Sequence, residues 1–550
     1  MNIFSPMLFT SLKSYSKKTL VSDLIAGIIV AVIALPLSIA LALASGVGPE
    51  QGLYTAIIAG FLISFLGGSN VQISGPTAAF ATIVAGVVAT YGLGGLAVAT
   101  VLAGIMLILM GIFKLGGLIK FIPYTITTGF TAGIAVTIVV GQLKDFFGLT
   151  YGADVKPIET VEKVEAVVHH FGTVNVWAVL VGVLALAVLI IWPKISRKIP
   201  GSLIAVIFGI ILVKVLAHFE IQVNTIGDLY TVSSALPKFT LPDFSVGMIK
   251  DVLPNAFTIA ILAAIESLLS CVVADGMTGS KHRSNTELIA QGVGNVGSAL
   301  FGGIPATGAI ARTAANIKNG GKTPVSGIVH AVVLLLVLVL LMPYASLIPM
   351  PVIAAILFMV AYNMCQWRPF VHIVKTAPKS DIFVLVLTFV LTVVFDLVVA
   401  IAVGIVLACV LFMKRMSDTS SIRSWKYGTE SENGKVIPEY IRVYELEGSL
   451  FFGSADILNS ITFKEYTKCL VLRMRSVSAI DATAMNGLVE LYDRCSEKGI
   501  KIVISHVNTQ PMNSMIKSGF ADMIGKDNFC HHIDDAIERA VEITEAQYCQ

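Results

Sequence analysis

The residues with the clearest potential for chemistry are ionisable side chains inside apolar segments. Glu266 lies in the run Ala263-Ala-Ile-Glu-Ser-Leu-Leu-Ser270, and Ser270 lies one helical turn away on the same face. Ionisable groups are costly in lipid, so such residues are functional by default. A carboxyl group here either carries a proton or stays ionised and coordinates Na⁺ together with Ser270. A structural contact with a neighbouring helix is the alternative.

Two short motifs could bind an anion. Ser74-Gly-Pro-Thr-Ala-Ala79 follows Phe65-Leu-Gly-Gly68, and Ile304-Pro-Ala-Thr-Gly-Ala309 follows Leu300-Phe-Gly-Gly303. Each proline suits the first position of a helix, where free N–H groups and the helix dipole favour anions. A single motif of this kind is best explained as a break between helices, but two matching copies favour a binding site. We expect backbone amides and hydroxyl groups from both motifs to converge on one cavity, namely those of Ser74, Gly75, Thr77, Ala78, Ala306 and Thr307.

Arg312 supplies a permanent positive charge near the second motif. If a helix begins at residue 306, Arg312 lies roughly one and a half turns past its start. It then either deepens the potential well for the anion or pairs with Glu266. The sequence leaves these two roles open.

The composition shows what surrounds these residues. The chain has 550 residues, of which 55% are hydrophobic and 13% charged, so it must use lipid as solvent. About 20 helical residues cross a bilayer. Apolar stretches predict fourteen segments, of which the third and tenth are half-helices: 23–44, 51–66, 76–92, 95–113, 121–142, 175–192, 202–217, 254–272, 287–301, 306–317, 324–342, 351–364, 381–395 and 398–413.

The distribution of basic residues supports this count. With the N-terminus in the cytoplasm, the inner loops hold fifteen Lys and Arg residues and the outer loops hold six. The two motifs stand seven segments apart, so they run in opposite directions through the membrane. This is the pattern of an inverted repeat whose two half-helices meet near the midplane.

The last part of the chain has a different character. Residues 1–413 hold 38 of the 73 charged side chains, and the last 137 residues hold the other 35. Strands are predicted at 440–446, 469–474 and 500–505, with helices at 482–498 and 534–544. The seven cysteines show no spacing typical of a metal site or a disulfide framework, and no motif for ATP binding or hydrolysis is present. We therefore expect a transporter driven by an ion gradient, without cofactor or resident metal, and not an enzyme or a nucleic-acid-binding protein.

These motifs resemble the SulP anion transporters, and the tail resembles their STAS domain. The marks are Asp23-Leu-Ile-Ala-Gly27, Pro36, Gly52-Leu-Tyr54, Ser74-Gly-Pro-Thr77, the run from Ala309 to Asn316, and Phe452. Ala264-Ile-Glu-Ser-Leu-Leu269 and Asp275-Gly-Met-Thr-Gly279 look most like the C4-dicarboxylate branch. The resemblance implies a seven-plus-seven inverted repeat with a core domain that moves as an elevator against a gate domain.

The same resemblance implies roles for single residues. Glu266 matches an acidic coupling residue, Ser270 matches a hydroxyl that helps to hold Na⁺ in the bicarbonate carriers, and Arg312 matches an arginine of the animal carriers. The bicarbonate branch has Asp in place of Glu266 and lacks the arginine, which weakens a Na⁺–bicarbonate assignment. The animal carriers have Gln where Leu37 stands, and this more apolar wall suits a carbon chain. In the tail, Asp481-Ala-Thr-Ala484 lacks the phosphorylatable Ser of related anti-sigma antagonists.

The sequence thus predicts a multi-pass α-helical protein of the bacterial inner membrane with a small α/β domain. The expected parts are a cytoplasmic segment 1–22, a transport domain 23–415, a linker 416–436 and a cytoplasmic STAS domain 437–547. The leading function is proton-coupled uptake of C4-dicarboxylates; sulfate or bicarbonate transport with H⁺ or Na⁺ is the alternative, with Na⁺ bound at Glu266, Ser270 and Thr307. An anion channel and a non-transporting STAS scaffold are the readings from other classes. We also expect a homodimer and a cytoplasmic protein partner for the STAS domain.

Overall fold

A computed structural model describes residues 4–117, 123–152, 155, 157–196, 199–395, 397–425 and 437–548. The chain divides into two compact units, Met1–Ile405 and Val406–Gln550. Much of the expected linker, residues 426–436, lies outside the described residues. The domain boundaries that the sequence suggests stay predictions.

The first unit is built of helices. Within the described residues, ten helices are long and apolar enough to cross a membrane. The helices of eight or more residues that begin in this unit are α2 (Lys17–Ala44), α3 (Pro49–Leu66), α4 (Ala81–Ile112), α5 (Tyr124–Phe147), α6 (Thr160–His169), α7 (Val176–Ile195), α8 (Gly201–His218), α10 (Val246–Thr278), α11 (Ser284–Leu300), α12 (Ile310–Lys318), α13 (Val325–Ala345), α14 (Met350–Cys365), α15 (Trp367–Thr376), α16 (Lys379–Val394) and α17 (Leu397–Thr419).

Each of the fourteen expected segments overlaps one of these helices. The third and fourth segments share α4, which is interrupted at Gly92, where φ is +70° and ψ is −173°. Only glycine adopts this backbone conformation readily, so the helix breaks there. The short helices α1 (Met7–Ser11), α6, α9 (Ile226–Leu229) and α15 were not expected. How many segments cross the bilayer stays a prediction.

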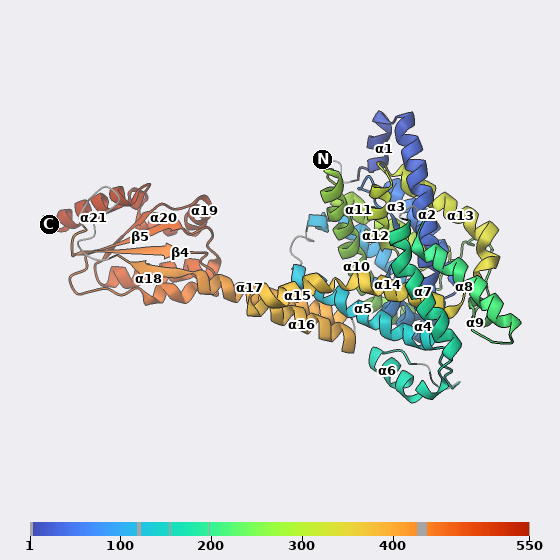
Figure 1. Cartoon of the computed structure of the whole chain (residues 1–550). Helices are drawn as coiled ribbons and strands as arrows, with labels where there is room; N and C mark the ends of the chain where they lie inside the picture. The colour runs from blue at the N-terminus through green and yellow to red at the C-terminus, as the bar shows by residue number, and fades with distance from the viewer. Residues whose placement is uncertain are drawn as a thin grey trace. The chain divides into compact units, whose positions relative to one another are not determined.

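The helices of this unit form two groups. Helices α2, α3, α4, α10, α11, α12 and α13 pack mainly on one another, and α5, α7, α8, α14 and α16 pack mainly on one another. In Figure 1, α14 lies beside α5 and α7, its main partners in the second group. Glycines allow the closest packing in the first group: a Cβ atom on Gly104 of α4 or on Gly292 of α11 would meet the carbonyl oxygen of the other. We call the first set of helices, which contains α4 and α11, the core group, and the second set, which contains α5 and α14, the gate group.

The second unit is a mixed sheet covered by helices on both faces. The strands are β3 (Ser421–Ser424), β4 (Ile441–Glu447), β5 (Cys469–Ser476), β6 (Lys501–Ser505) and β7 (Phe529–Cys530), in that spatial order. Strands β4 to β7 are parallel, and β3 joins β4 antiparallel. The helices are α18 (Ala482–Glu497), α19 (Thr509–Lys517), α20 (Phe520–Ile524) and α21 (Ile533–Tyr548).

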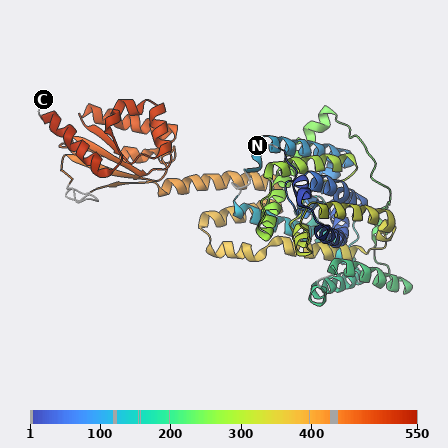
Figure 2. The same ribbon diagram turned by 90° about the horizontal axis from the view of Figure 1, so that it is seen from above.

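Two hydrophobic clusters hold this domain together. One packs α18, α19 and α20 against one face of the sheet, and the other packs α21 against the opposite face. Figures 1 and 2 show helices on both sides of the sheet. The apolar runs that predicted three strands became β4, β5 and β6, because a strand buried on both faces is apolar along its length. The short elements β3, β7, α19 and α20 were not predicted.

Candidate functional site

The two sequence motifs meet in the middle of the core group. Strand β1 (Ser74–Gly75) pairs antiparallel with strand β2 (Thr307–Gly308), so Ser74 lies opposite Gly308 and Gly75 lies opposite Thr307. The amide of Ala309 also donates to the carbonyl oxygen of Ile73 at 2.9 Å. This confirms that both copies of the motif lie together. We call this pair of strands the crossing.

The helix starts differ from those that the sequence suggested. Neither proline begins a helix: the short 3₁₀ turn η2 starts at Ala78, α4 at Ala81 and α12 at Ile310. Residues around Pro76 and Pro305 are extended because the two segments satisfy their backbone hydrogen bonds by pairing with each other. Arg312 therefore lies in the first turn of α12, and not one and a half turns into it.

Glu266 faces the start of η2 from the long helix α10. The hydroxyl of Thr77 donates a hydrogen bond of 2.9 Å to Oε2 of Glu266. Both side chains are partly exposed, whereas most of their neighbours are buried. The carboxyl group therefore contacts the segment that directly follows the crossing.

Arg312 is buried beside the crossing, with 3% of its surface exposed. Its Nη2 donates to the carbonyl oxygen of Pro76 at 3.2 Å and to Oγ of Ser38 at 3.4 Å. Its Nη1 has no hydrogen-bond partner among the described residues, where Glu266 and Arg312 form no ion pair either. A buried guanidinium nitrogen without an acceptor is rare and costly. Of the two roles that the sequence left open for Arg312, pairing with Glu266 is thus not seen among the described residues.

Thr307 and Ser270, the other residues predicted to bind Na⁺, are both hydrogen-bonded to neighbouring segments. The hydroxyl of Thr307 donates to the carbonyl oxygen of Ala263 at 2.8 Å, and that of Ser270 donates to Oγ1 of Thr313 at 3.3 Å. Both hydroxyl oxygens keep a lone pair with which they could coordinate a cation. The Na⁺ site stays a prediction. Among the described residues, no group of three or more His, Cys, Asp or Glu side chains could hold a metal ion.

Ala306 differs from its prediction. Its amide donates to Oδ1 of Asn295 at 2.9 Å, and its side chain packs in a buried cluster with Ala59, Ile63 and Ala290. Successive side chains of an extended segment point to opposite faces, so Thr307 faces α10 while Ala306 faces α3 and α11. Its amide is therefore not free to bind an anion, contrary to the expectation from the sequence.

Three polar residues of α11 were missed by the sequence analysis. Glu287, Gln291 and Asn295 are all buried, and their spacing of four places them on one face of the helix. This regular polar spacing in a segment of small and apolar residues was the signal that could have revealed them.

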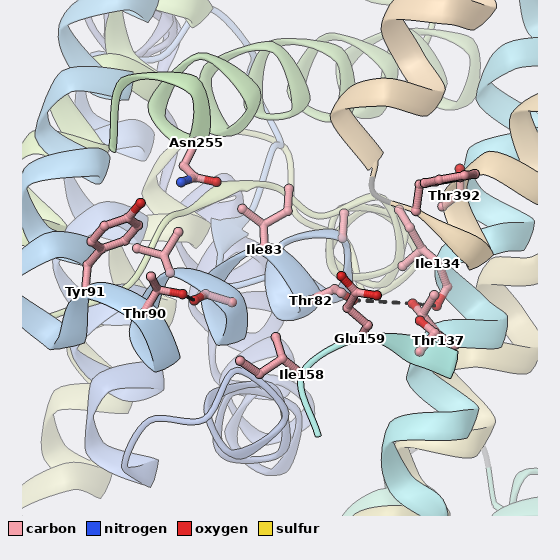
Figure 3. Close-up of a pocket in the computed structure, with 15 residues that line it drawn as sticks. Thr82, Ile83, Thr90, Tyr91, Ile134, Thr137, Ile158, Glu159, Asn255 and Thr392 are labelled. Atoms are coloured by element: carbon pink, nitrogen blue, oxygen red, sulfur yellow. Dashed lines mark hydrogen bonds between the residues drawn. The ribbon is translucent and has the colours of Figure 1, made fainter. Parts of the chain in front are cut away.

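A cavity of about 300 Å³ lies next to the crossing, between the core and gate groups. It is lined by Ala79, Thr82 and Thr90 from η2 and α4, by Thr137 from α5, by Asn255 from α10, by Thr392 from α16, and by residues 158–160. Figure 3 shows Thr82 and Thr137 pointing toward each other; their hydroxyl oxygens are 3.3 Å apart. Ala79 and Thr82 stand two and five residues after Thr77 in the chain, so the cavity begins close to the residue that contacts Glu266.

Within the described residues, the ten helices that are long and apolar enough to cross a membrane indicate a polytopic membrane protein. Comparison with known proteins gives the family. Residues 20–388 match the model of the sulfate permease family, and residues 435–538 match the STAS domain. The chain belongs to this family of anion transporters, and it is therefore a transporter and not an enzyme.

The relatives cover the chain almost completely. A putative sulfate transporter of Bacillus subtilis, YvdB, is 42% identical over 95% of this chain and 98% of its own length. The bicarbonate transporter BicA of a Picosynechococcus species is 30% identical over 94% of each chain. The solved structure of SLC26A9 superposes with a TM-score of 0.87, covering 98% of this chain and 93% of that one. At 19% identity, this likeness concerns the fold alone.

Proposed function

We propose that this protein is a secondary active transporter that takes up a small anion together with a proton. The observation that carries the proposal is the buried Nη1 of Arg312, which lacks an acceptor beside Gly75 at the crossing. An anion bound there supplies the missing acceptor. Thr77 and Ala78 follow β1 closely and α12 begins two residues after β2, so the amides of Thr77 and Ala78 and the start of α12 would add donors or a favourable dipole to such an anion.

Glu266 is our candidate for the residue that couples cation and anion. Its contact with Thr77 ties its state to the half-helix start that receives the anion. Protonation removes a negative charge close to the anion, so binding of proton and anion are mutually favourable, by a coupling free energy of typically about 1–3 kcal/mol. Na⁺ held by Glu266, Ser270 and Thr307 is the alternative coupling ion.

The elevator mechanism is supported by the two groups of helices. The core group carries Glu266, Arg312 and the crossing, and it makes few contacts with the gate group. The cavity lies between the groups on the side where α4 breaks at Gly92. A rigid movement of the core group relative to the gate group would carry the crossing from this cavity to the opposite side of the membrane.

Sulfate is the substrate that we propose to test first. The relative that is 42% identical over nearly the whole chain is called a putative sulfate transporter, and another is called a bicarbonate transporter. A C4-dicarboxylate is the second candidate. Leu37, which is partly exposed and precedes Ser38 in α2, is the apolar residue that supports this second candidate.

The remaining features of the proposal concern the setting of the transporter. We propose a homodimer in the bacterial inner membrane, with both termini in the cytoplasm. The STAS domain follows the last membrane helix and carries a charged surface suited to water. It would regulate rate or assembly through a cytoplasmic protein partner and would not form part of the pathway.

Uptake into proteoliposomes tests the proposal. Labelled sulfate, bicarbonate, succinate and fumarate are each offered under an imposed pH or Na⁺ gradient. We expect saturable accumulation of at least one anion, driven by the pH gradient. Passive conductance would indicate a channel, and absence of any flux from correctly folded protein would favour a scaffold.

The variant Glu266→Gln separates coupling from binding in the same assay. It mimics the protonated carboxyl group, so we expect it to bind and exchange the anion but not to accumulate it against a gradient. If it accumulates the anion as well as the parent does under the same pH gradient, Glu266 is not the coupling residue. Glu490→Gln, a change of an exposed carboxyl group on α18, is the matched control.

A further inference from the structure

A second cavity between the core and gate groups is lined by two lysines. It has a volume of about 380 Å³, and its wall includes Lys144 of α5, Lys163 of α6, and Ala85 and Ala89 of α4. Ile158 lines this cavity and also the cavity next to the crossing, where Figure 3 labels it. Both cavities therefore adjoin the same part of α4. We call the second one the lysine cavity.

Neither lysine has a carboxylate partner. Lys144 and Lys163 form no ion pair within the part of the chain that the structure describes. Lys144 lies over the ring of Tyr151, with 4.8 Å between Nζ and the ring centroid, and this contact positions the ammonium group without neutralising it. Lys163 is half-buried. Burial lowers the pKa of Lys163, and the charge of the adjacent Glu162 offsets this only in part, so its ammonium group has lost water without gaining an ion pair.

A buried amide also faces this cavity. Gln142 of α5 lines it, is only 6% exposed, and makes no side-chain hydrogen bond within the described residues. Buried polar side chains ordinarily have a partner. Tyr151 and Tyr230 line the same cavity, and their hydroxyl groups likewise make no hydrogen bond among the described residues. The amide and the two hydroxyls are therefore available as hydrogen-bond donors.

The charges on the wall of the lysine cavity favour an anion. Among the described residues that line it, Asp145 is the only acid, so two positive charges stand against one negative charge. An excess of positive charge in a cleft raises the local concentration of anions. The partial compensation by Asp145 keeps the attraction weak enough for release. The topology predicted from the sequence places Lys144 and Lys163 on the outer side of the membrane.

We propose that the lysine cavity is a second anion-binding site, in which Lys144 and Lys163 hold a small oxyanion such as sulfate or a dicarboxylate on its way to the crossing. Gln142, Tyr151 and Tyr230 would donate hydrogen bonds to this anion. The inference deepens the proposed function and rests on it, because it requires that anions enter between the core and gate groups. The site is separate from the one at the crossing.

Protection of Lys163 from acetylation tests whether the cavity binds an anion. Purified full-length protein reacts with acetic anhydride at pH 8 over a series of sulfate concentrations, and mass spectrometry measures the acetylation of each lysine. We expect saturable protection of Lys144 and Lys163. Lys250, an exposed residue of α10 that lines neither cavity, should be unprotected and thereby controls for ionic strength.

The variant Lys144→Gln tests whether both lysines share one anion. It should raise the sulfate concentration that half-protects Lys163 by roughly three- to five-fold, the effect of one partly exposed charge pair. Lys250→Gln is the matched control and should leave that concentration unchanged. Absence of protection at Lys163 in the parent, or an equal effect of both variants, overturns the inference.

The variant Arg312→Gln separates the lysine cavity from the crossing. It should weaken anion binding at the crossing while sulfate still protects Lys163. If Arg312→Gln does not fold, Gly75→Ala takes its place, since it displaces the same guanidinium group. Loss of protection in the folded variant would mean that the effect arises at the crossing, and this too overturns the inference.

A bulky group at position 163 tests whether the site lies on the pathway. Lys163→Cys is labelled with a bulky, negatively charged thiol reagent and reconstituted for anion uptake. We expect most of the uptake to be lost, while Lys250→Cys and the parent, treated in the same way, keep theirs. Full uptake by completely labelled Lys163→Cys overturns the inference and leaves the proposed function intact. Protection of Lys163 in a folded parent protein that transports no anion would instead refute the proposed function and support the binding site.

Discussion

Replacing Gly75 by alanine tests directly whether Arg312 binds the anion. A Cβ atom at this position would lie 2.5 Å from Nη1 of Arg312, whereas its next neighbours, Cα and Cβ of Ala56, would lie at 3.5 and 3.6 Å. The last two distances are ordinary contacts. The first is not, so the end of the arginine side chain must withdraw. Because that end is flexible, the fold should tolerate the change.

The size of the effect follows from this displacement. Nη1 must move by about 0.9 Å to reach an ordinary contact of about 3.4 Å, and a hydrogen bond of normal length does not survive such a shift. A hydrogen bond to a charged group is worth about 1.5–3 kcal/mol, which corresponds to roughly 10- to 100-fold in affinity. We therefore expect the dissociation constant of the anion to rise by that factor, while the unfolding temperature changes little.

The assay is binding of labelled sulfate or succinate to purified protein, followed by uptake in proteoliposomes. Gly94→Ala is the matched control, since a Cβ atom there meets no atom within 4 Å. In an Arg312→Gln background, Gly75→Ala should have no further effect. Wild-type affinity in folded Gly75→Ala would refute the placement of the anion beside Arg312.

Three further predictions concern support of the site and the tail. Asn295→Leu leaves the N–H and C=O of Ala306 buried and unpaired, each at a cost of about 1–3 kcal/mol. The unfolding temperature in detergent should therefore fall clearly, and an unchanged value would contradict the role of Asn295. Truncation after Arg415 should lower rate or abundance but keep the ranking of transported anions in the uptake panel, and a changed ranking would place the STAS domain in the pathway. Burial raises the pKa of Cys469 and of Cys495 to about 12, so both thiols stay protonated at pH 8. We expect both thiols to react with maleimide only after unfolding, which mass spectrometry can measure. Rapid labelling of the native protein would contradict this.

The sequence alone was sufficient for the class of the protein and for most of its helices. The apolar stretches predicted every long membrane helix, because a chain in lipid must satisfy its backbone hydrogen bonds within each segment and reveals this by composition. The internal repeat also predicted that residues 74–79 and 304–309 meet. In the tail, the apolar runs identified β4, β5 and β6 for a related reason, since strands buried on both faces are apolar throughout.

The tertiary structure alone decided which groups at the crossing are free. Local sequence suggested that Pro76 and Pro305 begin helices and that the Ala306 amide is exposed. Pairing of β1 with β2 keeps these segments extended, and Asn295 occupies that amide. Whether Arg312 meets Glu266 likewise depended on the direction of its side chain in three dimensions.

The part played by α11 was the hardest to see in the sequence. Glu287 stands near the end of an apolar segment, where a carboxylate is ordinarily solvated, and nothing in its immediate neighbours shows that four donors surround it. Those donors come from positions 68, 72, 267 and 291. Hydrogen-bond partners that are distant in the sequence are brought together only by packing of α3, α10 and α11, so the sequence determined the membrane helices while their packing decided the chemistry between them.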